Sequence, residues 1–167
     1  MPDVLPMDMS GVNFSPPVMA WRASSLKEKP KGGIATAPYK AMEAKWKKPG
    51  ARSDGFMNVH DEYNDQDGMV YFGTTATAPC DGTWRLYIGH DGGVKVFVDG
   101  KDILTAAKRF NPCLPGRSHA DVALSKGKHE IIVAFDLAAG NGWGIFGHVE
   151  ALGKQRKPKP RFPTFSV

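Results

Sequence analysis

Residues 82–100 read Gly-Thr-Trp-Arg-Leu-Tyr-Ile-Gly-His-Asp-Gly-Gly-Val-Lys-Val-Phe-Val-Asp-Gly, and this stretch decides the fold class. Side chains alternate in character over residues 83–88 and again over 94–98, which is typical of half-buried β-strands and would scatter the apolar face of a helix. Residues 89–93 separate the two runs and are rich in residues that tolerate positive φ. The pattern predicts an antiparallel hairpin with a polar, glycine-lined loop at its tip, and the function that we expect of such a loop is recognition.

The same alternation continues on both sides of this stretch. The predicted strands nearby are 69–77, 103–104 (short), 119–124, 128–137 and 143–151. Short strands at regular spacing, joined by Gly, Asp and Pro turns, favour an all-β antiparallel sandwich or jelly roll over a helical or doubly wound fold. We expect one short helix at residues 39–46, and one or two edge strands from the residues before position 69.

The chain length of 167 residues fits one domain with a sizeable core. We predict an irregular N-terminal arm over 1–20, a β-jelly-roll domain over 21–152 and a basic, proline-rich tail or linker over 153–167. Residues 1–20 have neither the basic start nor the apolar stretch of a secretory signal. No apolar run approaches the roughly 20 residues that span a bilayer. We therefore expect no membrane segment. A cytosolic protein, a mature form and a piece of a larger protein are all consistent with the sequence, and we favour the last.

The formal net charge of +5 does not indicate a nucleic-acid-binding protein. Five positive charges lie in the tail, so residues 1–153 sum to about zero. A phosphate-binding surface needs basic groups clustered on a folded face, usually with aromatic side chains that stack on bases. We therefore expect no nucleic-acid partner.

Two cysteines, Cys80 and Cys113, lie in predicted loops on either side of the central strands. They lack the spacing of a zinc site. A disulfide, which would suit an oxidising compartment, and two free thiols are both consistent with the sequence.

Several segments resemble the galactose-binding-like jelly rolls that are attached to bacterial polysaccharide-degrading enzymes. The segments are Asp81-Gly-Thr-Trp-Arg-Leu, Gly89-His-Asp-Gly-Gly-Val-Lys-Val-Phe-Val-Asp-Gly-Lys, Leu124-Ser-Lys-Gly-Lys-His-Glu-Ile-Ile-Val and Gly142-Trp-Gly-Ile-Phe-Gly. The second is also similar to the hairpin of protective-antigen-type sugar-binding domains. The resemblance covers roughly residues 68–151. It implies a carbohydrate-binding or accessory module, secreted or periplasmic, within a larger protein that has an adjoining catalytic domain.

A sugar site needs an aromatic face for the C–H surface of the ring and a few fixed polar groups for the hydroxyls. The candidate pairs are Trp143 with Asn141, His90 with Asp91, and Arg109 with Asn111. Two of these pairs have a structural alternative: Trp143 as a core or rim residue, and His90 and Asp91 as plain turn residues. Trp84 alternates with Leu86 and Ile88, so we expect it in the core.

Calcium is considered at two places. The related sugar-binding domains hold calcium through an Asp-Asp pair, but here the pair reads His90-Asp91, and imidazole is a poor ligand for this hard cation. The second place is the acidic run 60–68. An EF-hand spacing fails there at Tyr63, which leaves Asp65 and Asp67 as ligands of a structural calcium. A solvated acidic loop is the alternative.

The sequence contains no catalytic motif of the serine hydrolase, zinc protease or nucleotide-binding classes. We expect His129 and His148 on strand surfaces. Together with the module that the resemblance implies, the absence of such motifs predicts a non-catalytic module that recognises a polysaccharide or oligosaccharide. The alternatives are a structural spacer or protein-interaction domain on the same fold and, third, a small polysaccharide hydrolase or lyase.

Overall fold

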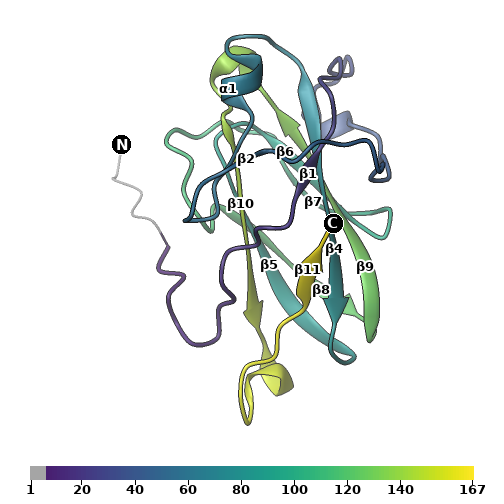
Figure 1. The fold of residues 1–167 in the computed structure, drawn as a ribbon, viewed down its shortest axis with the longest axis vertical. Helices are drawn as coiled ribbons and strands as arrows, with labels where there is room; N and C mark the ends of the chain where they lie inside the picture. The colour runs from purple at the N-terminus through teal and green to yellow at the C-terminus, as the bar shows by residue number, and fades with distance from the viewer. Residues whose placement is uncertain (1–6) are drawn as a thin grey trace.

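Two antiparallel β-sheets packed face to face hold most of the secondary structure in the computed structural model, which describes residues 7–167 (Figure 1). The six-stranded sheet has the order β1-β4-β9-β6-β7, with β11 also paired to β4, and the five-stranded sheet has the order β2-β3-β10-β5-β8. The strands are β1 (Arg22–Ala23), β2 (Gly50–Ala51), β3 (Met57–Asn58), β4 (Met69–Ala78), β5 (Gly82–His90), β6 (Val94–Val98), β7 (Lys101–Ala106), β8 (Ser118–Leu124), β9 (Gly127–Asp136), β10 (Gly144–Ala151) and β11 (Thr164–Ser166). The predicted all-β sandwich is confirmed.

The helical elements are few and short: η1 (Ile34–Thr36), α1 (His60–Tyr63), η2 (Ala138–Gly140) and η3 (Gly153–Arg156). None of them, within residues 7–167, is long and apolar enough to cross a lipid bilayer. The helix predicted at residues 39–46 is wrong. Trp46 is instead buried against Tyr71, with the rings 6.3 Å apart, and Lys47 forms a β-bridge with Ala23, so the packing of this segment overrides its helical pattern.

The predicted hairpin of β5 and β6 is also wrong, because the two strands belong to different sheets. β5 pairs with β10 and β8, whereas β6 pairs with β9 and β7. The inward side chains of both strands join one core, so the strands face each other across the sandwich. The loop 91–93 therefore crosses from one sheet to the other. Alternation predicts which face of a strand is buried but not which strand lies beside it.

Gly92 and Gly93 serve a close approach of the backbone rather than a positive φ, which neither residue has. A Cβ added at Gly92 would overlap the carbonyl oxygen of Asp136, and one added at Gly93 would overlap that of Ala107. The crossing loop therefore fits against the chain only where side chains are absent.

Substitution of Gly92 by alanine is expected to lower the free energy of unfolding by about 2–3 kcal/mol, because a backbone carbonyl must move to admit the methyl group. Urea denaturation measures the change. Gly50→Ala is the matched control: its Cβ would meet its nearest neighbour, the Asn58 oxygen, at an ordinary 3.5 Å, so a change within about 0.5 kcal/mol is expected. Equal effects of the two substitutions would contradict the close-packing explanation.

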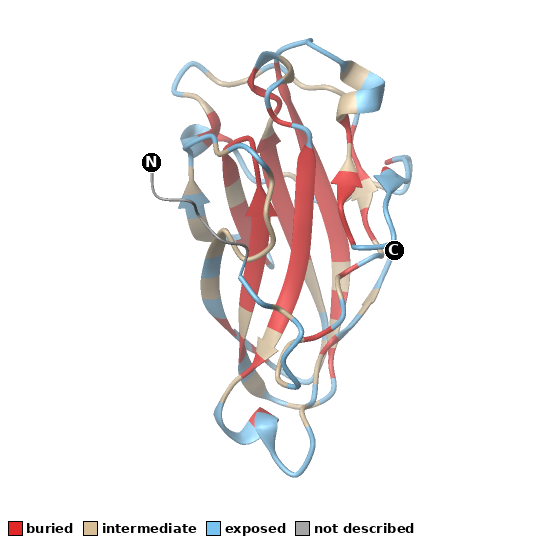
Figure 2. Ribbon diagram, turned by 90° about the vertical axis from the view of Figure 1, so that its left-hand side faces the viewer, coloured by how far each residue is buried: buried red, intermediate tan, exposed pale blue. Residues whose placement is uncertain are grey.

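The main core lies between the two sheets, and Figure 2 shows the buried residues concentrated along the central strands. Trp84 is fully buried there, as predicted. A second apolar cluster lies on the other side of the six-stranded sheet, where Ile34 and Trp46 pack with Tyr71 and Ile132. Segment 34–46 therefore covers the outer face of that sheet.

Both ends of the described chain attach to the sandwich. Ser15 N donates to Val149 O at 2.7 Å, so part of the predicted N-terminal arm runs along β10; its residues 1–6 lie outside the described residues. The sequence predicts a tail or linker over 153–167, but β11 within it joins the six-stranded sheet. The Trp84 indole N–H also donates to Arg161 O at 2.8 Å. This segment also makes apolar contacts with the core, which its Lys- and Pro-rich composition does not predict.

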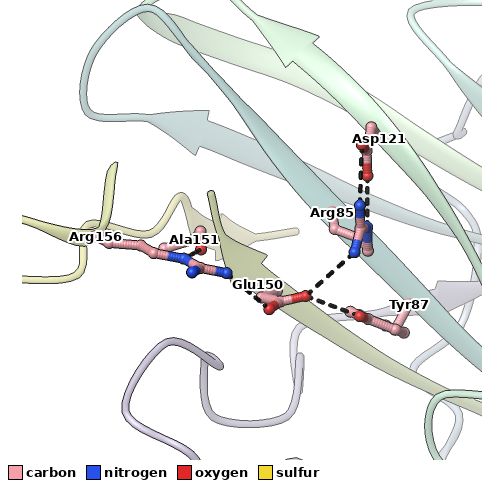
Figure 3. A network of polar contacts seen from close by, with 6 residues as sticks. All are labelled: Arg85, Tyr87, Asp121, Glu150, Ala151 and Arg156. Carbon is pink, nitrogen blue, oxygen red and sulfur yellow. Dashed lines mark hydrogen bonds and ion pairs between the residues drawn. The ribbon is translucent and has the colours of Figure 1, made fainter. Parts of the chain in front are cut away.

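The outer face of the five-stranded sheet carries a charged network (Figure 3). Arg85 pairs with Asp121 at 2.7 Å, while Glu150 accepts hydrogen bonds from Tyr87 at 2.8 Å and Arg156 at 3.3 Å. The guanidinium of Arg85 holds the pKa of Asp121 below its usual range. These side chains satisfy one another, and each exposed pair adds little to stability.

Candidate functional site

An open cavity of about 590 Å³ lies where β5 ends and β10 begins, at the end of the sandwich that carries α1 and is uppermost in Figure 1. Its size is in the range of small-ligand sites. It is lined by Arg52, Phe56, Asp91, Asn111, Pro112, Cys113 and Trp143. These residues come from four separate segments of the chain, which the two sheets bring together.

Asp91 is a buried carboxylate in the wall of this cavity, with 3% of its surface exposed. Its Oδ1 accepts three backbone N–H groups, from Gly92 at 2.9 Å, Trp143 at 2.8 Å and Gly144 at 3.2 Å. The second carboxylate oxygen, Oδ2, accepts no hydrogen bond from another residue of 7–167. Burial raises the pKa of Asp91, and the three N–H groups act in the opposite direction. One oxygen thus holds the start of β10 in place, and the other is left as an acceptor.

Trp143 stays 45% exposed although its ring is fixed. The indole stacks on the imidazole of His60, with centroids 4.1 Å apart and planes 4° from parallel, and its N–H donates to Gly140 O at 3.0 Å. Because His60 packs against one face of the indole, a ligand can contact only the other face and the edges of the ring. A rigid aromatic surface of this kind costs little entropy on binding.

The remaining walls come from Arg52 with Phe56 and from the loop after β7. The guanidinium of Arg52 lies 4.6 Å from the centroid of the Phe56 ring and pairs with Asp54 at 2.7 Å. The loop is anchored by the N–H of Phe110, which donates to Asp91 O at 2.8 Å, and Arg117 lies 4.1 Å from the centroid of the Phe110 ring. Asp91 therefore positions two walls of the cavity.

Both cysteines are free thiols, which answers the question that the sequence leaves open. Cys113 lines the cavity and contacts Gly144 O at 3.5 Å, whereas Cys80 donates to Gln155 Oε1 at 3.2 Å. Burial raises the pKa of the Cys113 thiol, with a smaller effect from Asp91 in the same direction. A neutral thiol is a poor nucleophile, so Cys113 acts as a wall residue.

His90 lies beneath the cavity and is fully buried. Nδ1 lies 2.8 Å from Gly92 O and Nε2 lies 2.8 Å from Ser118 Oγ. A carbonyl only accepts, so Nδ1 carries the proton and Nε2 accepts from the Ser118 hydroxyl. Burial lowers the pKa of His90 to about 4 and keeps the ring neutral. His90 is the last residue of β5 rather than a turn residue, and it lies outside the cavity lining.

Of the six predicted ligand-binding residues, the structure brings Asp91, Asn111 and Trp143 together in the cavity wall. His90 supports that wall from below. Arg109 and Asn141 are exposed and outside the lining, and the side-chain amide of Asn141 donates to Ala138 O at 2.9 Å. Sequence reasoning missed further wall residues and one supporting residue, for which no local pattern gives a signal: Arg52, Phe56, Pro112, Cys113 and His60.

The two carboxylates predicted for calcium are exposed near η2. Asp67 pairs with Lys29 at 2.9 Å and accepts the N–H of Ala139 at 2.9 Å, and Lys29 holds the pKa of Asp67 low. Within residues 7–167, no three His, Cys, Asp or Glu side chains form a group that could hold a metal ion. Calcium at Asp65 and Asp67 stays a prediction.

One of the two histidines expected on strand surfaces is placed otherwise. His148 is buried at 6% exposure, which lowers its pKa, so that expectation is wrong; the residue lies in β10, which is buried along most of its length. His129 is partly buried near the start of β9, where its Nδ1 lies 2.6 Å from Asp99 Oδ2.

No protein-family model matches the sequence, and no curated protein matches it. Solved structures do match the fold. A β-glucosidase from Kluyveromyces marxianus matches with a TM-score of 0.52 and 13% identity over 81% of this chain and 16% of that one. A GH2 β-galacturonidase from Eisenbergiella tayi matches with a TM-score of 0.50 and 14% identity, over 87% of this chain and 27% of that one. An anti-sigma factor domain-containing protein from Clostridium clariflavum matches with a TM-score of 0.52 and 17% identity, over 87% of this chain and 45% of that one.

At these identities the matches show the fold alone. They confirm the predicted likeness to β-sandwich domains found in glycan-active enzymes, and this chain spans less than half the length of each of these three proteins. The activity of any larger protein is therefore a matter for proposal.

Proposed function

We propose that this chain is a non-catalytic carbohydrate-binding module whose site is the cavity at Asp91 and Trp143. The observation that carries the proposal is the pairing of a rigid, exposed indole with the second carboxylate oxygen of Asp91, which accepts no hydrogen bond from another residue of 7–167. An indole face suits the C–H surface of a pyranose ring, and a carboxylate accepts hydrogen bonds from its hydroxyls. Asn111 adds an amide at the rim.

The composition of the wall supports binding rather than cleavage. Glycoside hydrolysis generally uses two carboxyl groups about 5–9.5 Å apart. Among the described residues that line the cavity, Asp91 alone carries a carboxyl group, and three backbone N–H groups hold it. The fold matches to two glycosidases favour a polysaccharide as the ligand and an adjoining catalytic domain as the partner, in a secreted or periplasmic protein.

Trp143→Ala is expected to weaken glycan binding at least tenfold, because the stacking platform is removed. The fold should lose only about 1 kcal/mol, since the ring is nearly half exposed and its main contact is the stack on His60. Calorimetric titration with a glycan that the wild type binds measures the affinity, and urea denaturation measures the free energy of unfolding.

Tyr39→Ala is the matched control, because Tyr39 is also an exposed aromatic residue at 41% but packs near Phe97, away from the cavity. Its binding should equal that of the wild type. Unchanged binding by Trp143→Ala would overturn the proposed site. If that variant does not fold, Trp143→Phe retains part of the platform and tests the same point.

A further inference from the structure

A second, smaller cavity of about 210 Å³ lies at the same end of the sandwich. It is lined by Ser24, Ser25, Lys27, Lys45, Trp46, Lys47, Glu62 and Tyr63. Lys27 forms a β-bridge with Met69, the first residue of β4. Met69 in turn pairs with Asp136, the last residue of β9, so the cavity lies where β4 begins and β9 ends. α1 borders both cavities, because His60 stacks on Trp143 while Glu62 and Tyr63 line the smaller one.

The smaller cavity has an excess of positive charge. Lys27 and Lys47 form no salt bridge with any residue of 7–167, and Lys45 pairs only with Glu43, at 3.1 Å, with 80% of its side chain exposed. Glu62 is the one acidic residue in the described lining, and it lies beside the Tyr63 hydroxyl; burial and this carboxylate raise the pKa of Tyr63. Three lysines line so small a space, and an anion bound among them would offset their like charges.

The basic character belongs to a folded segment. Residues 21–48 hold eight Lys and Arg against two Glu, so the neutral sum over residues 1–153 conceals a strongly basic stretch. This stretch is fixed to the sandwich by β1 on β4 and by Trp46 on Tyr71. The fold therefore holds the backbone of these lysines close together at the cavity.

We propose that this cavity binds an oxyanion, a carboxylate or a sulfate, carried by an acidic sugar. Lys27 and Lys47 are the charged groups that bind it, and the exposed Ser25 offers a hydroxyl at the rim. Binding of the anion is independent of the larger cavity, whereas the assignment of the anion to a sugar rests on the function proposed above. The ligand of the whole module is then an acidic rather than a neutral glycan.

Backbone amide NMR titrations test the proposal on the full chain. Sodium glucuronate, sodium sulfate and glucose are added at constant ionic strength, with sodium chloride as the balancing salt. Both anions should give saturable shifts at residues 24–27 and 45–47, and glucose should give none there. In Lys27→Gln/Lys47→Gln the apparent affinity should fall at least tenfold. Lys126→Gln/Lys128→Gln removes the same charge at the start of β9, the opposite end of the sandwich, and should behave as the wild type.

The outcomes separate the parts of the proposal. Anion shifts no larger than those with chloride, or equal affinities in the two double variants, overturn the site. Glucuronate that binds more weakly than sulfate indicates a site for free inorganic anions and overturns the assignment to a sugar. The indole signal of Trp143 reports the larger cavity independently, so failure of the proposed function is distinguishable from failure here.

Discussion

Asp91→Ala is expected to lower the free energy of unfolding by about 3–5 kcal/mol. The substitution removes the acceptor of three backbone N–H groups, of Gly92, Trp143 and Gly144, at a residue that is itself only 3% exposed. Each buried donor left without a partner costs about 1–3 kcal/mol, and the costs of neighbours are not fully additive. Urea denaturation at pH 7 measures the total.

Asp91→Asn separates the structural role from the role in binding. Its amide oxygen still accepts the three N–H groups, so most of the stability should be retained, while loss of the charged acceptor should weaken glycan binding about tenfold. Asp102→Ala is the control for removal of an aspartate: its 3.6 Å pair with Lys95 is half exposed, and a change within about 0.5 kcal/mol is expected. A loss below 1 kcal/mol in Asp91→Ala would show that Asp91 does not hold the start of β10.

His90 should make the fold sensitive to acid. Its pKa is about 4 in the folded chain against a usual value of 6.5, so the unfolded chain takes up the proton first as the pH falls. The contribution of the neutral ring to stability is complete above pH 6.5 and is lost as the pH falls towards 4. A pKa difference of this size corresponds to about 3 kcal/mol. Urea denaturation from pH 7 to pH 4 follows the loss.

The comparison with His90→Gln isolates this effect. The raised pKa of Asp91 acts in the opposite direction, since the folded chain then takes up that proton more readily, and the buried His148 acts in the same direction as His90. Both residues remain in the variant, so the difference between the two pH profiles belongs to His90. Parallel profiles would contradict the assignment. If the variant does not fold, an imidazole NMR titration of the folded wild type replaces it. Protonation of His90 at pH 6 in that titration would contradict the assignment as well.

The sequence was sufficient for the fold class because burial alone sets the alternation of strands. Trp84 and its neighbours in β5 are buried as the period of two requires. Strand partners were not predictable in the same way, and β5 and β6 face each other across the core although only a three-residue loop joins them. That loop is crowded by Asp136, a residue far away in the sequence.

The site was predictable only in part, for a related reason. Asp91 and Trp143 carry signals of their own in the sequence, a carboxylate in a glycine-rich turn and a tryptophan directly after Asn-Gly, and both line the cavity. Arg52 and Phe56 lie in a segment without periodicity and reach the cavity through the pairing of β3 with β10. The stack of His60 on Trp143 depends on the same pairing and has no counterpart in sequence spacing.

The central claim is that the cavity at Asp91 and Trp143 binds a glycan. A screen of the wild-type chain and Trp143→Ala against immobilised plant, algal and host glycans, each with and without a chelator, tests it most directly. The account predicts that the wild type is retained by one class of glycan, with acidic members preferred, and that the variant is not retained. The chelator lanes test calcium at Asp65 and Asp67 in the same experiment. Silence of the wild type across the whole panel, with the fold intact, would contradict the account and favour a spacer or protein-interaction domain.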